Sequence, residues 1–196
     1  ENLERIKYNA GLLGIPLNIF RSDVFEAAEM VNADSPCYMC ARMRRGCLYA
    51  RAKELGCNKI ALGHHRSDVI ETTLMGMFYG GQVQGMMPRI KSSNFEGMEL
   101  IRPMYCISEE DIEHWRDYNG LHFIACACSF TQRLADSGQA RSVRAEMKEL
   151  VKEMKRRNPD VEKSLFRSIH NVQLDTLPGW KSQGVVHSFL ERFEDD

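Results

Sequence analysis

An apolar run, a short polar loop and an amphipathic stretch follow one another over residues 59–79, and this succession constrains the fold most. The run Lys59–Gly63 has the length and composition of a buried strand. The stretch Asp68–Tyr79 has helical spacing and stops at two glycines, with an apolar face expected at Ile70, Leu74, Met77 and Phe78. In an open α/β sheet, a strand, a tight loop and a helix N-terminus form a ligand-facing edge. The sequence therefore predicts an α/β fold with its site at this loop.

The rest of the chain also alternates between helical and strand-like patterns. Apolar spacing, helix-forming residues and terminal glycines predict helices over residues 2–13, 41–55, 109–119 and 143–157, and another from residue 161. Short apolar runs predict strands over residues 15–20 and 123–125. A turn-rich segment, residues 92–97, predicts a hairpin that joins residues 87–91 to 98–101. The polar stretch after Gly179 favours fraying.

Composition limits the class of protein. With 196 residues, 43% of them hydrophobic, the chain can bury the core of one compact domain. No run approaches the roughly 18 apolar residues of a membrane span, and the first twenty residues show no secretory signal. Because the formal net charge is -1, a nucleic-acid partner must meet a local basic patch. The odd number of cysteines, 7, favours a reducing compartment, and we expect the cytoplasm.

Cysteines form the second informative pattern. Cys37 and Cys40 are a C-x-x-C pair, and Cys126 and Cys128 lie far away in sequence. Such a set can hold an iron-sulfur cluster, or a structural zinc ion bound by four thiolates. A thioredoxin-type redox pair is disfavoured, because that motif lies in another strand and helix arrangement. The remaining cysteines are expected to be packing residues, namely Cys47, Cys57 and Cys106.

Four runs at consistent spacing resemble a known family. Together, the segments 37–49, 61–68, 77–81 and 101–104 are similar to those of tRNA 2-thiocytidine synthetases, which are PP-loop ATP pyrophosphatases. The likeness keeps the same order from about Gly14 to Asn171. It implies a Rossmann-like open parallel sheet flanked by helices, with a partial PP-loop domain over residues 1–130 and a helical extension over 131–196. It also implies an enzyme that uses ATP with magnesium to replace the C2 oxygen of an anticodon-loop cytidine by sulfur.

The resemblance also implies roles for particular residues. A 4Fe–4S cluster would be held by Cys37, Cys40 and Cys126, with Cys128 as the alternative third ligand. Nucleotide binding would fall to Gly63, His64 and Asp68, and Asp68 would be the catalytic residue. The implied partners are tRNA, ATP and a sulfur donor such as a cysteine desulfurase, and a homodimer is plausible by analogy.

Plainer interpretations exist for several of these residues. Arg42, Arg44 and Arg45 follow the cysteine pair and could meet an RNA backbone, yet three arginines are also ordinary on a solvated helix face. Asp68 in a first helical turn could simply complement the helix dipole. His64 could bind zinc with its neighbour His65, but adjacent side chains of an extended segment point to opposite sides. We therefore expect only one of the two, His64, to face a nucleotide.

The chain departs from the family pattern in two places. The nucleotide loop Ser-Gly-Gly-x-Asp-Ser, which follows the first strand of the family, is absent from this sequence. The chain therefore looks N-terminally truncated, and we expect it to bind ATP poorly by itself, because the backbone amides that cradle pyrophosphate are missing. The second departure is Ser67, which stands where the family usually has the first of two adjacent aspartates.

Other functions remain open at this point. A uridine-thiolating enzyme is a near relative of the favoured function, whereas lysidine synthetases lack the paired cysteines. From a different class, the chain could be a zinc-stabilised RNA-binding or scaffold protein with a degenerate nucleotide site. Metal identity separates these functions, because a structural zinc site has no open position for sulfur.

Overall fold

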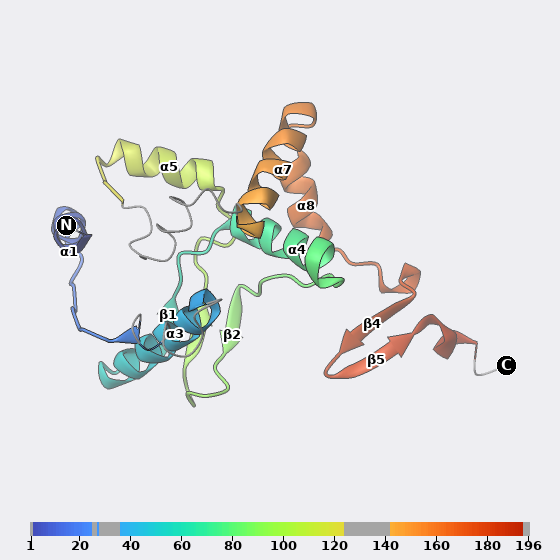
Figure 1. The fold of residues 1–196 in the computed structure, drawn as a ribbon, viewed down its shortest axis with the longest axis horizontal. Helices are drawn as coiled ribbons and strands as arrows, with labels where there is room; N and C mark the ends of the chain where they lie inside the picture. Colours follow the sequence, from blue (N-terminus) through green and yellow to red (C-terminus); the bar gives the residue numbers. More distant parts are fainter. Residues whose placement is uncertain (1, 25–26, 28–35, 124–141, 194–196) are drawn as a thin grey trace. The chain divides into compact units, whose positions relative to one another are not determined.

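The computed structural model describes residues 2–24, 27, 36–123 and 142–193. Two compact units are present, one up to Lys148 and one from Glu149 onward, and the boundary falls within a helix. Figure 1 shows the described elements of the first unit as helices and short strands that alternate along the chain. They are α1 (Asn2–Leu12), α3 (Pro36–Glu54), β1 (Lys59–Ala61), α4 (Arg66–Gly80), β2 (Arg89–Lys91), β3 (Glu99–Ile101), α5 (Glu109–Tyr118) and the start of α7 (Val143–Arg157).

The described sheet has three strands in the order β1-β3-β2. β1 and β3 are parallel, with Ile60 opposite Leu100, whereas β2 and β3 are antiparallel. The predicted hairpin is thus confirmed, and its turn is closed by the Ser92 amide on the Met98 carbonyl (2.9 Å) and by Gly97 at φ 78. The expected parallel arrangement is present between β1 and β3, and the hairpin makes the described sheet a mixed one.

A small apolar core joins α3 to this sheet. Tyr49, Ile60, Met98 and Leu100 are buried together, and the Tyr49 ring stacks on Phe95 with 5.0 Å between ring centroids. α3 begins at Pro36 rather than at residue 41, so the C-x-x-C pair lies inside its first turns. Proline is favoured at the first position of a helix, because its missing N–H has no intrahelical partner there. The cysteine pair is therefore part of a regular helix.

α4 follows β1 as predicted and is the most buried helix of the site. Val69 and Ile70 have 0% and 2% of their surface exposed, and Leu74 is also buried. Met77 and Phe78 were expected on the same face, but they are 48% and 60% exposed. The helix ends at Gly81, which takes the left-handed conformation (φ 59) that glycine adopts without strain. The buried residues of α4 therefore lie in its N-terminal half, next to the β1–α4 loop.

Two other predictions have different outcomes. Ser108 is the N-cap of α5, as expected, and its hydroxyl accepts a hydrogen bond from the Asp111 amide at 3.1 Å. Residues 15–20 form no strand, and Ile15, Leu17 and Ile19 remain about half exposed, at 55%, 44% and 50%. That strand prediction is wrong, because apolar composition alone does not supply a pairing partner. Of the strand expected over residues 123–125, only Phe123 lies within the described residues.

The second unit contains the end of α7, α8 (Val161–Ser168) and a β-hairpin of β4 (Gly179–Ser182) and β5 (Val185–Ser188), with short 3-10 helices at Leu174–Thr176 and Phe189–Arg192. The hairpin replaces the fraying expected after Gly179. Its turn residues Gln183 and Gly184 both have positive φ, 51 and 84, which suits a tight two-residue hairpin loop. The extension therefore adds a hairpin to its two predicted helices.

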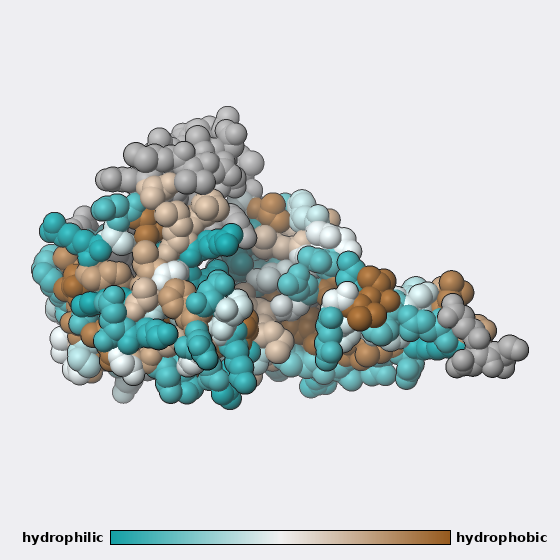
Figure 2. All heavy atoms as spheres, turned by 90° about the horizontal axis from the view of Figure 1, so that it is seen from below, coloured by the Kyte–Doolittle hydropathy of each residue, from teal (hydrophilic) through white to brown (hydrophobic). Residues whose placement is uncertain are grey.

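Surface polarity is mixed. On the face drawn in Figure 2, brown apolar residues lie among teal hydrophilic ones. Within the described residues, no helix is both long and apolar enough to cross a membrane.

Candidate functional site

The site is built on the loop between β1 and α4. Leu62 donates its amide to the Ile101 carbonyl, and Arg66 donates its amide to the Ile107 carbonyl, both at 2.9 Å. These bonds tie the loop to the last residue of β3 and to the segment that follows it. A Cβ added at Gly63 would meet only the Met104 methyl, at an ordinary contact distance of 3.5 Å. Protein packing therefore does not require glycine here, and the open face leaves room for a ligand to approach the backbone.

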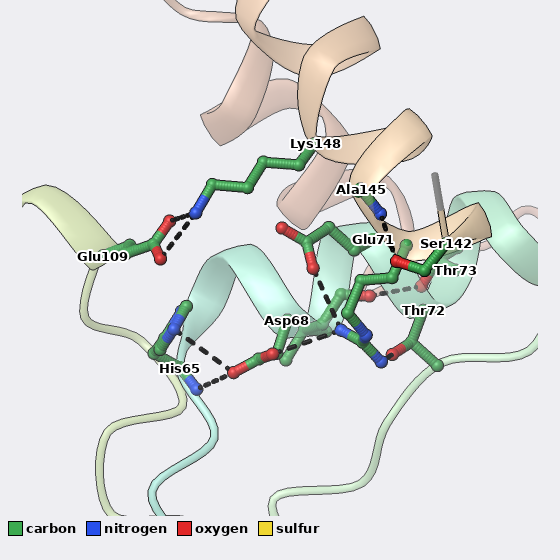
Figure 3. A network of polar contacts seen from close by, with 11 residues as sticks. His65, Asp68, Glu71, Thr72, Thr73, Glu109, Ser142, Ala145 and Lys148 are labelled. Atoms are coloured by element: carbon green, nitrogen blue, oxygen red, sulfur yellow. Dashed lines mark hydrogen bonds and ion pairs between the residues drawn. The ribbon is translucent and has the colours of Figure 1, made fainter. Parts of the chain in front are cut away.

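Asp68 lies in the first turn of α4 with both carboxylate oxygens engaged (Figure 3). Its Oδ2 accepts a hydrogen bond from the His65 amide at 3.1 Å and lies 3.3 Å from His65 Nε2. Its Oδ1 accepts from Arg144 Nη1 at 3.1 Å. The side chain keeps 22% of its surface exposed, so it is oriented but still open to a ligand.

Arg144 joins a second carboxylate to this arrangement. Its Nη1 also lies 3.0 Å from Glu71 Oε2, and its Nη2 donates to Thr72 Oγ1 at 3.2 Å. Burial raises the pKa of Glu71, and the hydrogen bond and charge of Arg144 act in the opposite direction. The sequence analysis missed both residues. Glu71 could have been found, because an acid three positions after Asp68 lies on the same face of a helix. Nothing in the sequence around Arg144 links it to Asp68.

The charges of Asp68 and of three arginines act on His64. Burial lowers its pKa, and the charges of Arg102, Arg144 and Arg45 lower it further, while Asp68 acts in the opposite direction. Burial thus favours the neutral form of the imidazole. Its Nδ1 is buried without a hydrogen-bond partner among the described residues, and so is Arg102 Nε. Burial also lowers the pKa of Arg102, and the charge of Arg45 adds to that effect. The arrangement suits a ligand that brings negative charge and hydrogen-bond acceptors.

The three arginines predicted to meet RNA are exposed on α3. Arg45 is the one whose charge acts on both His64 and Arg102. The structure therefore connects this arginine electrostatically with the β1–α4 loop, whereas Arg42 and Arg44 are placed only on the exposed surface of α3.

The cysteine ligands are placed only in part. Cys40 is half-buried on α3. Cys37 lies one turn earlier on the same helix, three positions away, so the two belong to one helix face. Cys126 and Cys128 lie outside the described residues, and within the described residues no cluster of three or more histidine, cysteine or acidic side chains could hold a metal. The cysteine ligand set therefore stays a prediction.

Cys57 and Cys106 are exposed, and Cys47 is half-buried. The prediction that they pack in the core is wrong for the first two. Cys57 follows the turn that ends α3 and Cys106 lies within a turn, whereas Cys47 lies inside α3.

Comparison with known proteins supports one family. The family model described as a PP-loop domain matches residues 3–134. A tRNA-cytidine(32) 2-sulfurtransferase of Burkholderia multivorans is 36% identical over 162 residues, which are 82% of this chain and 46% of the relative. Proteins of the same name from Geobacter metallireducens and Vibrio cholerae are 40% and 37% identical, covering 71% and 82% of this chain and 51% and 50% of their own lengths. The chain thus spans about half the length of these curated relatives.

A solved structure shares the fold. The U34-tRNA thiolase NcsA from Methanococcus maripaludis, determined with its 4Fe–4S cluster, superimposes with a TM-score of 0.67. The match covers 92% of this chain and 59% of that chain at 19% sequence identity. At this identity the likeness concerns the fold.

Proposed function

The chain belongs to the PP-loop domain family, and on this premise we propose that it is part of an ATP-dependent tRNA sulfurtransferase that replaces the C2 oxygen of an anticodon-loop cytidine by sulfur. The observation that carries the proposal is the 36% to 40% identity to relatives named for this reaction. The same alignments extend over 71% to 82% of the chain.

The chemistry explains the residue types at the site. The C2 oxygen of cytidine is a poor leaving group, and its attack on the α-phosphate of ATP, which releases pyrophosphate, turns it into a good one. Sulfur then takes its place and AMP leaves. A site for these steps must hold phosphates and a base in a fixed geometry. His64 Nδ1 and Arg102 Nε, which have no hydrogen-bond partner within the described part of the chain, and the open backbone at Gly63 are suited to the first task.

Asp68 is the proposed catalytic carboxylate. The His65 amide and Arg144 hold its two oxygens from opposite sides, so its orientation is set before substrate binds. Because it lies in the first turn of α4, after the C-terminal end of β1, it lies where ligands bind in α/β sheets of this type. Arg45, with Arg42 and Arg44 on the same helix, is proposed to bring the RNA backbone toward this carboxylate.

The proposed metal centre uses Cys37, Cys40 and Cys126, with Cys128 as the alternative third ligand. Three thiolates leave one iron of a 4Fe–4S cluster without a protein ligand, and that position can hold the incoming sulfide. The helix N-terminus that carries the first two cysteines favours the negative charge of a thiolate-bound cluster. We further propose a reducing compartment, ATP with magnesium, a cysteine desulfurase as sulfur donor, and a homodimer.

A uridine substrate is the second candidate, because the solved structure with the same fold is named a U34-tRNA thiolase. Mass spectrometry of tRNA nucleosides separates the two functions. In cells that lack the natural gene carrying this sequence, we expect 2-thiocytidine to disappear and 2-thiouridine to persist; the reverse result would establish the uridine function.

Metal analysis tests the cluster. Protein purified without oxygen is assayed for iron, zinc and acid-labile sulfide, with Cys40→Ala and Cys126→Ala as test variants and the exposed Cys57→Ala as the matched control. We expect iron and sulfide in the unmodified protein and the control, and their loss in both test variants. Stoichiometric zinc without sulfide would instead support the zinc-stabilised RNA-binding or scaffold protein.

A further inference from the structure

Two cations on the first turns of α7 reach the acidic side chains of neighbouring helices. Arg144 contacts Asp68 and Glu71 of α4 at 3.1 and 3.0 Å, and Lys148 lies 2.6 Å from Glu109 of α5. Arg144 and Lys148 are four positions apart, so they share one face of α7. Figure 3 shows Lys148 extending toward Glu109, and Asp68 and Glu71 side by side on α4.

The contacts of Arg144 differ from those of Lys148. A guanidinium is planar and presents its N–H groups in a fixed fork, whereas an ammonium acts as a point charge. Arg144 uses one nitrogen for two carboxylates and the other for Thr72 Oγ1. Because three acceptors surround one planar group, its rotation and that of the carboxylates are restricted together.

Glu71 is the more deeply buried of the two carboxylates that contact Arg144. Its side chain is only 8% exposed, compared with 22% for Asp68. A buried carboxylate needs a charged hydrogen-bond donor, and Arg144 is the donor that contacts it. The more exposed Asp68 is free to meet a ligand on its open side.

We propose that Arg144 is a positioning residue that fixes the Asp68 carboxylate at the start of α4, and that the buried Glu71 holds Arg144 in place for this task. The inference rests on the proposed function, because that function assigns Asp68 to the reaction. A role limited to neutralising Glu71 would need only one of the three contacts of Arg144. The bond from the His65 amide to the other oxygen of Asp68 completes the orientation.

The first test is a double-mutant cycle in the natural protein that carries this chain, assayed for tRNA thiolation. We expect Arg144→Gln to lower kcat by about tenfold to a hundredfold, with little change in the KM for tRNA, because a misplaced catalytic group slows the reaction more than it weakens binding. Arg144→Lys should recover part of the rate. In an Asp68→Asn background, Arg144→Gln should have no further effect, because residues that act through one another are not additive.

The matched control is Arg156→Gln, which removes an arginine of the same helix whose partner is the exposed Glu153. Equal rates for Arg144→Gln and this control would overturn the proposal. Equal losses with and without the Asp68 substitution would also overturn it, because they would show that Arg144 does not act through Asp68.

The second test needs no activity and uses hydrogen exchange of the His65 amide in the chain itself. This amide is bonded to Asp68 Oδ2, so its protection reports how firmly the carboxylate is held. Arg144→Gln and Glu71→Gln should each raise its exchange rate by about tenfold, the effect of weakening a hydrogen bond to a charged group. Arg156→Gln should not, and the sheet amide of Leu100 should stay protected in every variant, which shows that the fold is intact.

Unchanged exchange at His65 would overturn the proposal whatever the activity. If the unmodified protein thiolates no tRNA but His65 exchange responds as expected, the proposed function fails and the positioning of Asp68 by Arg144 stands.

Discussion

Two regions are held together in opposite ways. One is the edge around Asp68, where Arg144 contacts Asp68 and Glu71 of α4, and the other is the β4–β5 hairpin. At the edge, Arg144 is bonded to side chains 76 and 73 positions away in sequence. In the hairpin, the Ser188 amide is bonded to Glu191, 3 positions away, and Trp180 stacks on its cross-strand neighbour His187 with 5.0 Å between centroids. The first region needs the folded unit to bring its parts together, whereas the second is closed by its own turn.

The pKa values of two glutamates, Glu71 and Glu191, shift in opposite directions in these two regions. Burial raises the pKa of Glu71 at the edge, despite the contact with Arg144. In the hairpin, a hydrogen bond from the Ser188 amide, followed by the contact with His187, lowers the pKa of the exposed Glu191. Desolvation therefore dominates in one region and local hydrogen bonding in the other.

Loss of the catalytic carboxylate should be the largest effect. We expect Asp68→Asn to lower tRNA thiolation at least about a hundredfold, because removal of a catalytic acid or base costs this much or more. Asp117→Asn is the matched control, since Asp117 is exposed and paired only locally with Arg116 at 2.7 Å. Activity is measured as 2-thiocytidine formed per enzyme, and equal activity of the two variants would remove Asp68 from the mechanism.

Loss of a buried side chain should give the next largest effect. The resulting change in the free energy of unfolding should be large in α4 and small in the hairpin. Ile70→Ala, at 2% exposure, should lower the free energy of unfolding by about 2–5 kcal/mol, because it leaves a cavity under α4. Val186→Ala in β5, at 66% exposure, should change it by no more than about 0.5 kcal/mol. Urea unfolding followed by circular dichroism measures both, and a similar cost at the two positions would contradict the burial described here.

An aromatic pair tests whether the hairpin depends on local contacts alone. Trp180→Ala should cost the hairpin about 0.5–1.5 kcal/mol through loss of the stack on His187. Hydrogen exchange of the Val185 and His187 amides, which belong to the hydrogen-bonded pairs of the antiparallel ladder, measures this cost, with the exposed Trp115→Ala as control. We expect thiolation to stay unchanged, and a loss of activity would show that the hairpin takes part in the function.

The dependence of stability on pH should be the smallest effect and should have opposite signs in the two regions. The folded pKa of Glu71 lies above the ordinary value of 4.5 for a glutamate, so the folded state binds more protons and loses stability as the pH rises from that value through the folded pKa. The folded pKa of Glu191 lies below 4.5, so its contribution is present above that pH and is lost as the pH falls through the folded pKa.

The measurement is the difference in unfolding free energy between the unmodified chain and each of Glu71→Gln and Glu191→Gln across this pH range. The Glu71 variant should gain relative to the unmodified chain as the pH rises, and the Glu191 variant should lose. Slopes of the same sign would show that burial does not govern Glu71.

Local signals predicted much of the fold. The start of α5 was found because Ser108 and the acids after it form a helix N-terminus within four residues. The β2–β3 hairpin was found because its turn residues lie between two apolar runs. The β4–β5 hairpin was missed, since Gln183 and Gly184 are a weaker turn signal than Asn-Gly and the strands around them are exposed.

The site was predicted only where its residues are neighbours in sequence. Gly63, His64 and Asp68 lie on one loop and its helix, and the motif that contains them is recognisable in the sequence alone. The sequence by itself therefore determined the family, the β1–α4 unit and the carboxylate that begins the helix.

Only the tertiary structure decided what surrounds that carboxylate. Arg144 looks like any other cation on an amphipathic helix, and no periodicity links it to Asp68 or to the buried Glu71. Hydrophobic periodicity reports which face of a helix is buried, but not which polar groups meet across the contact. The pairing of Arg144 with two carboxylates exists because packing of the first unit brings the start of α7 to α4, and burial of Glu71 then makes a charged partner necessary.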